Sequence, residues 1–199
     1  NFLTSTIPTE LGNLIRLLEL YFDDNDLVGA VPSELGNLAN LEILSLSANS
    51  LSGTLCTELG NLESLQELTL SSNNITGTLS VELVAGLRQV TDFYIDDNAL
   101  SGSLPTELAK MINCEELILT HNQITGEIPT ELGALKSLHV LSLGENSLSS
   151  SRPTERCCSD SEEVLALLIN NLSVAIPTEL SPLLHLTSFL LYVNFLSSS

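Results

Sequence analysis

The residues of this chain that could do redox or metal chemistry are few and widely spaced. Its four cysteines are Cys56, Cys114 and the adjacent pair Cys157 and Cys158. They do not form the Cys-x-x-Cys pairs of zinc and thiol-redox motifs. Cys114 stands where the pattern of the chain expects a core leucine, which predicts a buried thiol, and Cys56 is expected to lie too far from it for a disulfide. Cysteine usage therefore leaves the redox compartment open.

The sequence also lacks the residue constellations of an enzyme. It has no Gly-rich phosphate loop and no nucleophile elbow. Its three histidines are scattered, and His121 is expected on a strand, at the surface. Two acidic runs, 23–26 and 96–98, carry the oxygen ligands that calcium prefers, but neither completes an EF-hand loop. We therefore expect no catalytic residue, no metal and no cofactor.

Composition excludes further classes of function. Six Lys and Arg against 25 Asp and Glu give a net charge of −19, and binding to a nucleic-acid backbone needs clustered positive charge. The longest mostly apolar stretch, 183–196, contains His185 and is too short to span a bilayer. We expect neither nucleic-acid binding nor membrane insertion within this segment. Leucine supplies 44 of the 199 residues, which suggests one small unit repeated many times.

An asparagine recurs every 24 residues along the chain, with a single interval of 25. The positions are Asn1, Asn25, Asn49, Asn73, Asn98, Asn122, Asn146, Asn170 and Asn194. Alternating apolar residues before each internal asparagine, such as Leu44 and Leu46, predict a short half-buried strand. Stacked asparagine amides would satisfy the backbone of the bend that follows. Gly, often Pro, and then Thr-Glu-Leu come next, which predicts an unusual backbone angle, an extended segment and a short helix capped by Thr or Ser.

The repeated unit LxxLxxLxLxxNxLxGxIPxELGN resembles the leucine-rich repeat in its 24-residue plant-type form, and residues 38–61 match it nearly in full. The resemblance covers the whole chain. It implies an α/β repeat solenoid: a right-handed superhelix with a concave parallel β-sheet, short convex helical turns, and a second short sheet near the Gly-x-Ile-Pro segment. We expect a single domain, 1–199, of about eight repeats.

Three features depart from that pattern. An extra residue near 84–86 predicts a bulged convex loop. Residues 149–163 lose core leucines, so we expect an irregular edge there, either a degenerate repeat or a functional loop. Neither end shows the cysteine-bearing cap usual in plant-type families, and Leu3 and Ile7 are expected to lie open at one end. We therefore expect either a longer natural chain or ends that are covered by a partner. Association of the protein through its uncapped ends is one way in which a partner would cover them.

The residues that flank the inward leucines of the concave strands make one surface, acidic in repeats 2 to 6 and apolar in repeats 7 to 9. A basic protein or peptide is its simplest complement, although a solvated face of an acidic protein explains the same pattern. The resemblance to receptor-like kinase ectodomains and secreted inhibitor-type repeat proteins of plants and algae implies non-enzymatic recognition at an extracellular or cell-surface location. The expected polar contacts are Tyr21, Asp23, Glu67, Asp92, Tyr94, Asp96 and Glu116, and the expected apolar anchors are Leu168 and Tyr192.

A second surface gives an alternative function. Ser or Thr often stands on both sides of each Gly, and stacking would arrange these residues in a regular grid. Such a grid resembles ice-binding solenoids, so the alternative is an ice-binding or cell-surface structural protein. Hydroxyl residues at these positions are also ordinary for the plant-type repeat. The grid residues are Thr54, Thr76, Thr78, Ser101 and Ser103.

Two triplets, Asn74-Ile75-Thr76 and Asn171-Leu172-Ser173, fit the acceptor pattern for N-glycosylation. They are compatible with secretion. The repeat produces such triplets easily by chance, so the pattern alone does not identify a modified residue.

Overall fold

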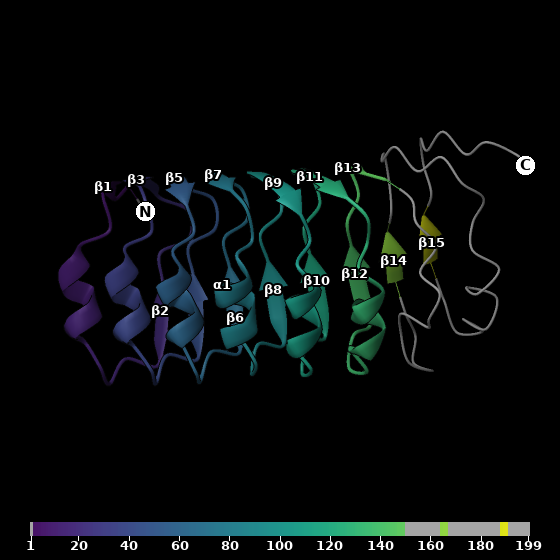
Figure 1. Ribbon diagram of the computed structural model, residues 1–199. Helices are drawn as coiled ribbons and strands as arrows, with labels where there is room; N and C mark the ends of the chain where they lie inside the picture. The colour runs from purple at the N-terminus through teal and green to yellow at the C-terminus, as the bar shows by residue number, and fades with distance from the viewer. Residues whose placement is uncertain (1, 150–163, 167–187, 191–199) are drawn as a thin grey trace, which may run out of the picture.

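The computed structural model describes residues 2–149, 164–166 and 188–190, and the chain forms coils that stack side by side (Figure 1). The coils contribute strands to two parallel sheets, one of eight strands and one of seven, and short helical turns link the sheets. The predicted repeat solenoid is therefore confirmed.

The eight-stranded sheet, which we call the concave sheet, is built from strands of three residues. Consecutive strands pair in a direct register, so that Leu44 lies opposite both Leu20 and Leu68. Side chains alternate along a strand, and the middle residue of each described strand from 19 to 142 is buried. The strands are β2 (Glu19–Tyr21), β4 (Ile43–Ser45), β6 (Glu67–Thr69), β8 (Asp92–Tyr94), β10 (Glu116–Ile118), β12 (Val140–Ser142), β14 (Val164–Ala166) and β15 (Ser188–Leu190).

We call the seven-stranded sheet the second sheet. Its strands run along the top of the molecule in Figure 1, above the helical turns. Five of its strands run through or end at the glycine of the repeat, and the φ of these five glycines lies between 75° and 84°. The strands are β1 (Thr4–Ser5), β3 (Asp26–Gly29), β5 (Ser50–Thr54), β7 (Asn74–Gly77), β9 (Ala99–Ser103), β11 (Gln123–Gly126) and β13 (Ser147–Leu148).

Five of the helical turns are 3-10 helices with a glutamate in the first turn, as the sequence predicts. The prediction that Thr or Ser caps them is wrong. Proline or Cys56 occupies the cap position, and the threonine lies one residue too late, so Thr57 Oγ1 donates only to its neighbour Glu58 at 3.3 Å. The 3-10 helices are η1 (Thr9–Asn13), η2 (Ser33–Asn37), η3 (Thr57–Asn61), η4 (Thr106–Lys110) and η5 (Thr130–Ala134).

The extra residue of the fourth repeat lies in an α-helix, α1 (Val81–Gly86), and not in the bulged loop that we expected. Here the Val84 amide donates to the Ser80 carbonyl, and Ser80 Oγ accepts from the Leu83 amide, both at 3.2 Å. The wider turn of an α-helix takes up one more residue than the 3-10 turns beside it. The coil therefore absorbs the insertion without losing its stacking.

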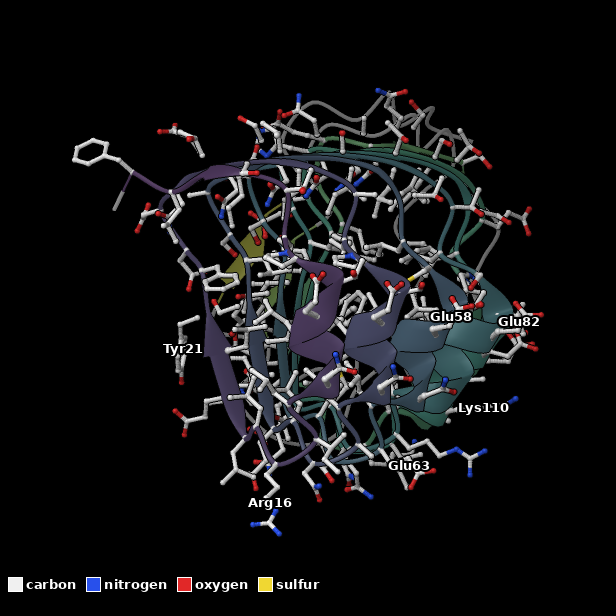
Figure 2. All side chains as sticks on the ribbon, turned by 90° about the vertical axis from the view of Figure 1, so that its left-hand side faces the viewer. Arg16, Tyr21, Glu58, Glu63, Glu82 and Lys110 are labelled. Atoms are coloured by element: carbon white, nitrogen blue, oxygen red, sulfur yellow. The ribbon has the colours of Figure 1, made fainter. Side chains whose placement is uncertain are left out.

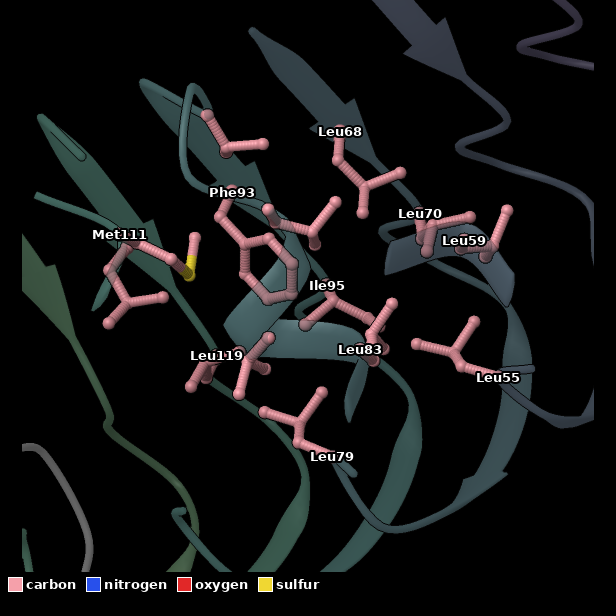
Figure 3. Packing of buried hydrophobic residues seen from close by; sticks show 14 of the residues in the cluster. Leu55, Leu59, Leu68, Leu70, Leu79, Leu83, Phe93, Ile95, Met111 and Leu119 are labelled. Atoms are coloured by element: carbon pink, nitrogen blue, oxygen red, sulfur yellow. The ribbon is translucent and has the colours of Figure 1, made fainter. Parts of the chain in front are cut away.

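The core is a set of leucine columns that runs through the stacked coils. Phe93 replaces leucine in one column and is fully buried, and Figure 3 shows it between Leu68 and Met111. Burial of one such side chain stabilises the fold by about 1.5–3 kcal/mol. At the first coil Leu3 is half-exposed, as expected, but Ile7 is buried because it packs into the core cluster, so that prediction is wrong.

The asparagines form a ladder that joins each coil to the one before it. Asn73 Oδ1 accepts from the Leu51 amide at 2.9 Å, while its Nδ2 donates to the carbonyls of Leu46 and Leu70 at 3.0 and 3.1 Å. The predicted role of asparagine in the bend is confirmed. The same pattern recurs at Asn49, Asn98, Asn122 and Asn146.

The residue before each ladder asparagine adopts a left-handed conformation, with φ between 50° and 55°. His121 is one of these residues, so it lies in the turn after β10 and not on a strand as predicted. No helix in the described part of the chain combines the length and the hydropathy that crossing a membrane requires.

Candidate functional site

The concave sheet brings three of the predicted carboxylates, Glu67, Asp92 and Glu116, into one column. Its register places Glu67 opposite Asp92 and Asp92 opposite Glu116, while Tyr94 lies opposite Thr69 and Ile118. We call Glu19, Glu67, Asp92 and Glu116 the acidic column. Figure 2 shows Tyr21 beside the concave strands, on the side away from Glu58, Glu82 and Lys110 of the helical turns.

Tyr94 links two members of the acidic column. Its hydroxyl lies 2.6 Å from Glu116 Oε2 and 3.2 Å from Asp92 Oδ1, so it donates between the two carboxylates. Thr91 Oγ1 donates to the other oxygen of Asp92 at 2.7 Å. Burial raises the pKa of Tyr94, and acceptance of its proton by Glu116 raises this pKa further, so the phenol remains a donor. His139 Nε2 lies 3.8 Å from Glu116 Oε1 at the border of this cluster.

Glu67 stands in the middle of the column without a hydrogen bond from the described side chains. Partial burial raises the pKa of Glu67, and the negative charges of Asp92 and Asp23 raise it further. No Lys or Arg in the described part of the chain forms an ion pair with the acidic column. Lys136, for example, donates from Nζ to the carbonyl of Gly133 within η5. The column therefore carries uncompensated negative charge.

Asp23 and Asp96, also predicted as contacts, are held by neighbouring coils. Asp23 Oδ1 accepts from Ser45 Oγ at 2.5 Å and from the Ser47 amide at 2.9 Å. Ser45 Oγ in turn lies 2.6 Å from Thr69 Oγ1. Asp96 accepts from Ser71 in the same way, at 2.5 Å. One oxygen of each carboxylate is thus used structurally, and these serine and threonine partners were missed at the sequence level.

His121 lies in the turn after β10 and contacts carboxylates of two neighbouring coils. His121 Nε2 lies 2.6 Å from Glu145 Oε2, and its Nδ1 lies 3.6 Å from Asp97 Oδ1, so this exposed imidazole bridges two carboxylates. Within residues 2–149 and the two short strands beyond them, no three His, Cys, Asp or Glu side chains are arranged to hold a metal ion.

Cys56 and Cys114 are both free thiols, as the sequence predicts. Burial raises the pKa of Cys114 to about 12, so its thiol stays protonated, and burial also raises the pKa of Cys56. Cys157 and Cys158 lie outside the described residues.

A polar groove of about 700 Å³ follows the loops that lead into β4, β6, β8 and β10. It borders the concave sheet at the edge where these strands begin. Its lining combines carboxylates, amides and hydroxyls: Glu42, Glu63, Ser64, Gln66, Gln89, Thr91, Asn113, Glu115 and Ser137. The groove extends the polar surface beyond the acidic column.

The apolar half of the predicted surface is described only in part. The strand register of the concave sheet continues into this half. Val140 lies opposite Val164, Ser142 lies opposite Ala166, and Ala166 lies opposite Leu190. Leu168 and Tyr192, the predicted anchors, lie outside the described residues, as does nearly all of the segment 149–163.

The hydroxyl residues of the alternative site lie on the second sheet, but not in the straight grid that we expected. Thr54 lies opposite Thr76, and Thr76 lies opposite Ala99, so the register shifts by about two residues in each coil. Thr78 lies just beyond the end of β7. The hydroxyls of Thr76 and Ser101 each donate to a glycine carbonyl of the preceding coil at 3.2 Å. Ser103 is exposed near the end of β9.

Comparison with known protein families gives a match to the family described as Leucine Rich Repeat, over residues 40–62, 64–85 and 113–135. A comparison of the sequence with curated proteins finds no match.

Solved structures have a similar coil arrangement. A TDR receptor is 35% identical, with a TM-score of 0.91 over 98% of this chain and 33% of that one. The plant peptide hormone receptor RGFR1, in complex with RGF2, is 35% identical, with a TM-score of 0.86 over 94% of this chain and 30% of that one. A plant ice-binding protein is 28% identical, with a TM-score of 0.74 over 96% of this chain and 69% of that one. The chain spans about a third of the length of the two receptors.

Proposed function

Because this chain is a plant-type leucine-rich repeat solenoid, we propose that its concave sheet is a non-enzymatic recognition surface for a protein or peptide, at an extracellular or cell-surface location. The observation that carries this proposal is the acidic column. Glu67, Asp92 and Glu116 stand in register on adjoining strands, and Glu19 continues the same column beyond Ile43. No Lys or Arg is paired to them in the described part of the chain. A plant peptide hormone receptor with the same coil arrangement supports a peptide as the ligand class.

We propose further that the partner is basic. Like charges placed side by side cost free energy in the unbound protein, and a cationic ligand removes that cost. Glu67 would contact the ligand directly, since its carboxylate is not used by the described side chains. Tyr94 would hold Asp92 and Glu116 in fixed orientations, because its hydroxyl lies within hydrogen-bond distance of both. Leu168 and Tyr192 remain the proposed apolar anchors at the other end of the surface.

The test is the binding of an arginine-rich peptide, followed by fluorescence anisotropy at low and high NaCl concentration. Glu67→Lys should weaken binding at least tenfold, and raising the salt should weaken binding to the wild type. Glu58→Lys on helix η3 is the matched control, because it changes the net charge equally on the opposite side of the coil. Equal weakening by both variants, or binding that salt does not affect, would refute concave recognition of a basic ligand.

Ice binding is the second candidate function, and one arrangement favours it: Thr54 and Thr76 are exposed and adjacent on the second sheet. A plant ice-binding protein has a similar coil arrangement. The shifted register argues against an extended flat lattice. Unglycosylated protein should be assayed for inhibition of ice recrystallisation, together with a Thr76→Tyr and Thr78→Tyr double variant. Activity in the wild type that the variant loses would support this candidate, and an inactive wild type would remove it.

A further inference from the structure

Two adjacent asparagines, Asn73 and Asn74, have opposite environments. The amide of Asn73 belongs to the ladder, and its oxygen and nitrogen are both occupied by backbone groups. Asn74 is exposed at the start of β7, and no described residue hydrogen-bonds its side chain. Ile75, the next residue, is buried, so Asn74 and Thr76 project from the same outer face of the second sheet.

These three residues are the acceptor triplet noted above, and we propose that Asn74 is N-glycosylated. Such triplets arise by chance, but a triplet serves as a site only if its asparagine is accessible in the final fold. Asn74 meets that condition, whereas the asparagine beside it could not carry a sugar without leaving the ladder. This proposal rests on the extracellular or cell-surface location proposed above.

The reaction transfers an oligosaccharide from a lipid-linked pyrophosphate donor of the secretory pathway. Asn74 Nδ2 attacks the anomeric carbon of the first sugar, and a carbon–nitrogen bond forms. The bond between that carbon and the phosphate oxygen breaks, and the lipid pyrophosphate leaves with the electron pair. The nitrogen gives up one of its two protons to base and keeps the other, so no oxidant or reductant takes part.

The surroundings of Asn74 leave room for a glycan. Its partner across β5 is Ser52, a small and exposed residue, and the next pair along the two strands is Thr54 and Thr76. A glycan rooted here would stand among these hydroxyl residues and cover this part of the second sheet. The acidic column, on the separate concave sheet, would remain accessible. The modification would therefore favour concave recognition over ice binding in the mature protein.

The test is secretion of the full chain from eukaryotic cells, with peptide mapping by mass spectrometry after enzymatic removal of glycans in heavy-oxygen water. An Asn171→Gln background leaves Asn74 as the single acceptor triplet. We expect Asn74 to carry the label. Asn74→Gln and Thr76→Ala should lose the glycan, while Thr76→Ser should keep it, since serine also completes the triplet.

Ser50→Asn in the same background is the positive control. It places an Asn-Leu-Ser triplet at the equivalent exposed position of β5, on the neighbouring coil. An unmodified Asn74 in secreted protein would overturn the proposal, whether or not the control position is glycosylated. Peptide binding measured before and after glycan removal reports on the concave sheet separately, so failure of one proposal does not imply failure of the other.

Discussion

At the scale of single residues, the side-chain amide of each ladder asparagine joins two neighbouring coils by hydrogen bonds. The amide offers two donor hydrogens and one acceptor oxygen, and Asn73 uses both kinds of group on backbone atoms of its own and the preceding coil. Two of these partners, the Leu51 amide and the Leu46 carbonyl, belong to the preceding coil. The ladder therefore couples the stability of each coil to that of its neighbour.

Asn73→Ala should lower the free energy of unfolding by about 2–3 kcal/mol, because it leaves the Leu51 amide and the carbonyls of Leu46 and Leu70 without this partner. Chemical denaturation of protein made in bacteria, and therefore without glycans, measures the change. Asn74→Ala is the matched control and should stay within about 0.5 kcal/mol of the wild type. Similar losses from the two variants would show that the ladder bonds are not what stabilises the bend.

Glu67 should make stability depend on pH in a direction opposite to that of an ion-paired carboxylate. Its pKa in the fold is raised above the unfolded value, so the fold binds the proton more tightly than the unfolded chain does. This contribution to stability is fully present below the unfolded pKa, which is about 4.3, and it is lost as the pH rises through the higher folded value.

Glu67→Gln should therefore raise the free energy of unfolding at neutral pH by a few tenths of a kcal/mol, an effect limited by solvent screening, and should give no gain near pH 3.5. Urea denaturation at the two pH values measures the difference. Glu58→Gln, on the exposed first turn of η3, is the control for loss of a negative charge outside the acidic column. A gain that is equal at both pH values would contradict the assignment to Glu67 protonation.

At the scale of elements, two glycines of the second sheet allow the cost of a left-handed backbone to be distinguished from the cost of steric overlap. Gly53 and Gly77 have nearly the same backbone, with φ of 82° and 84°. A Cβ on Gly53 would meet only Ala30, at 3.4 Å, whereas a Cβ on Gly77 would approach the Thr54 methyl group to 2.6 Å. The left-handed backbone penalises both substitutions, but steric overlap penalises only the second.

Gly53→Ala should lower the free energy of unfolding by about 1–2 kcal/mol, which is the left-handed cost alone. Gly77→Ala should cost more, and Thr54→Ser should recover the excess in the double variant, because serine lacks the methyl group that clashes. Thermal unfolding of the wild type, the Gly77→Ala and Thr54→Ser single variants and their double variant gives the coupling between positions 54 and 77. If the change in the free energy of unfolding of the double variant equals the sum of the changes in the two single variants, Thr54 moves aside without cost.

The sequence predicts the strands and helical turns well because the same residue pattern recurs in each repeat and gives the same prediction several times. The apolar alternation before every asparagine places the concave strands, and the strand register then brings Glu67, Asp92 and Glu116 together. The hydroxyl partners of Asp23 were missed because Ser45 lies 22 residues away and is an unremarkable strand residue in the pattern. The shifted register of the second sheet could not be predicted, since the repeat pattern does not determine how far each strand is displaced along its neighbour.

The sequence pattern also could not predict the form of the helical turn in the fourth repeat. One inserted residue could produce a loop or a wider helix, and both keep the repeat in phase. The structure forms α1, in which Ser80 supplies the side-chain cap that the 3-10 helices lack. The choice depends on hydrogen-bond geometry within six residues, for which the sequence pattern gives no signal.

At the scale of the whole molecule, a net charge of −19 opposes compaction as well as attracting a basic partner. The acidic column concentrates this repulsion, because neighbouring strands of a sheet lie only about 4.8 Å apart. Added salt screens repulsion within the fold and attraction to a cationic ligand alike. The two effects have opposite signs, so the same carboxylates should make the fold more stable and the complex weaker as salt rises.

Raising NaCl from about 0.01 M to about 0.5 M should increase the free energy of unfolding by on the order of 1 kcal/mol, as the Debye length falls well below the size of the molecule. Thermal denaturation across this range measures the effect. The Glu67→Gln and Glu116→Gln double variant should show a smaller salt dependence than the Glu58→Gln and Glu82→Gln double variant, which removes equal charge from the helical side. If both double variants respond to salt equally, the repulsion is a property of the total charge. The acidic column would then be an ordinary solvated surface, and the electrostatic argument for a basic partner would lose its support.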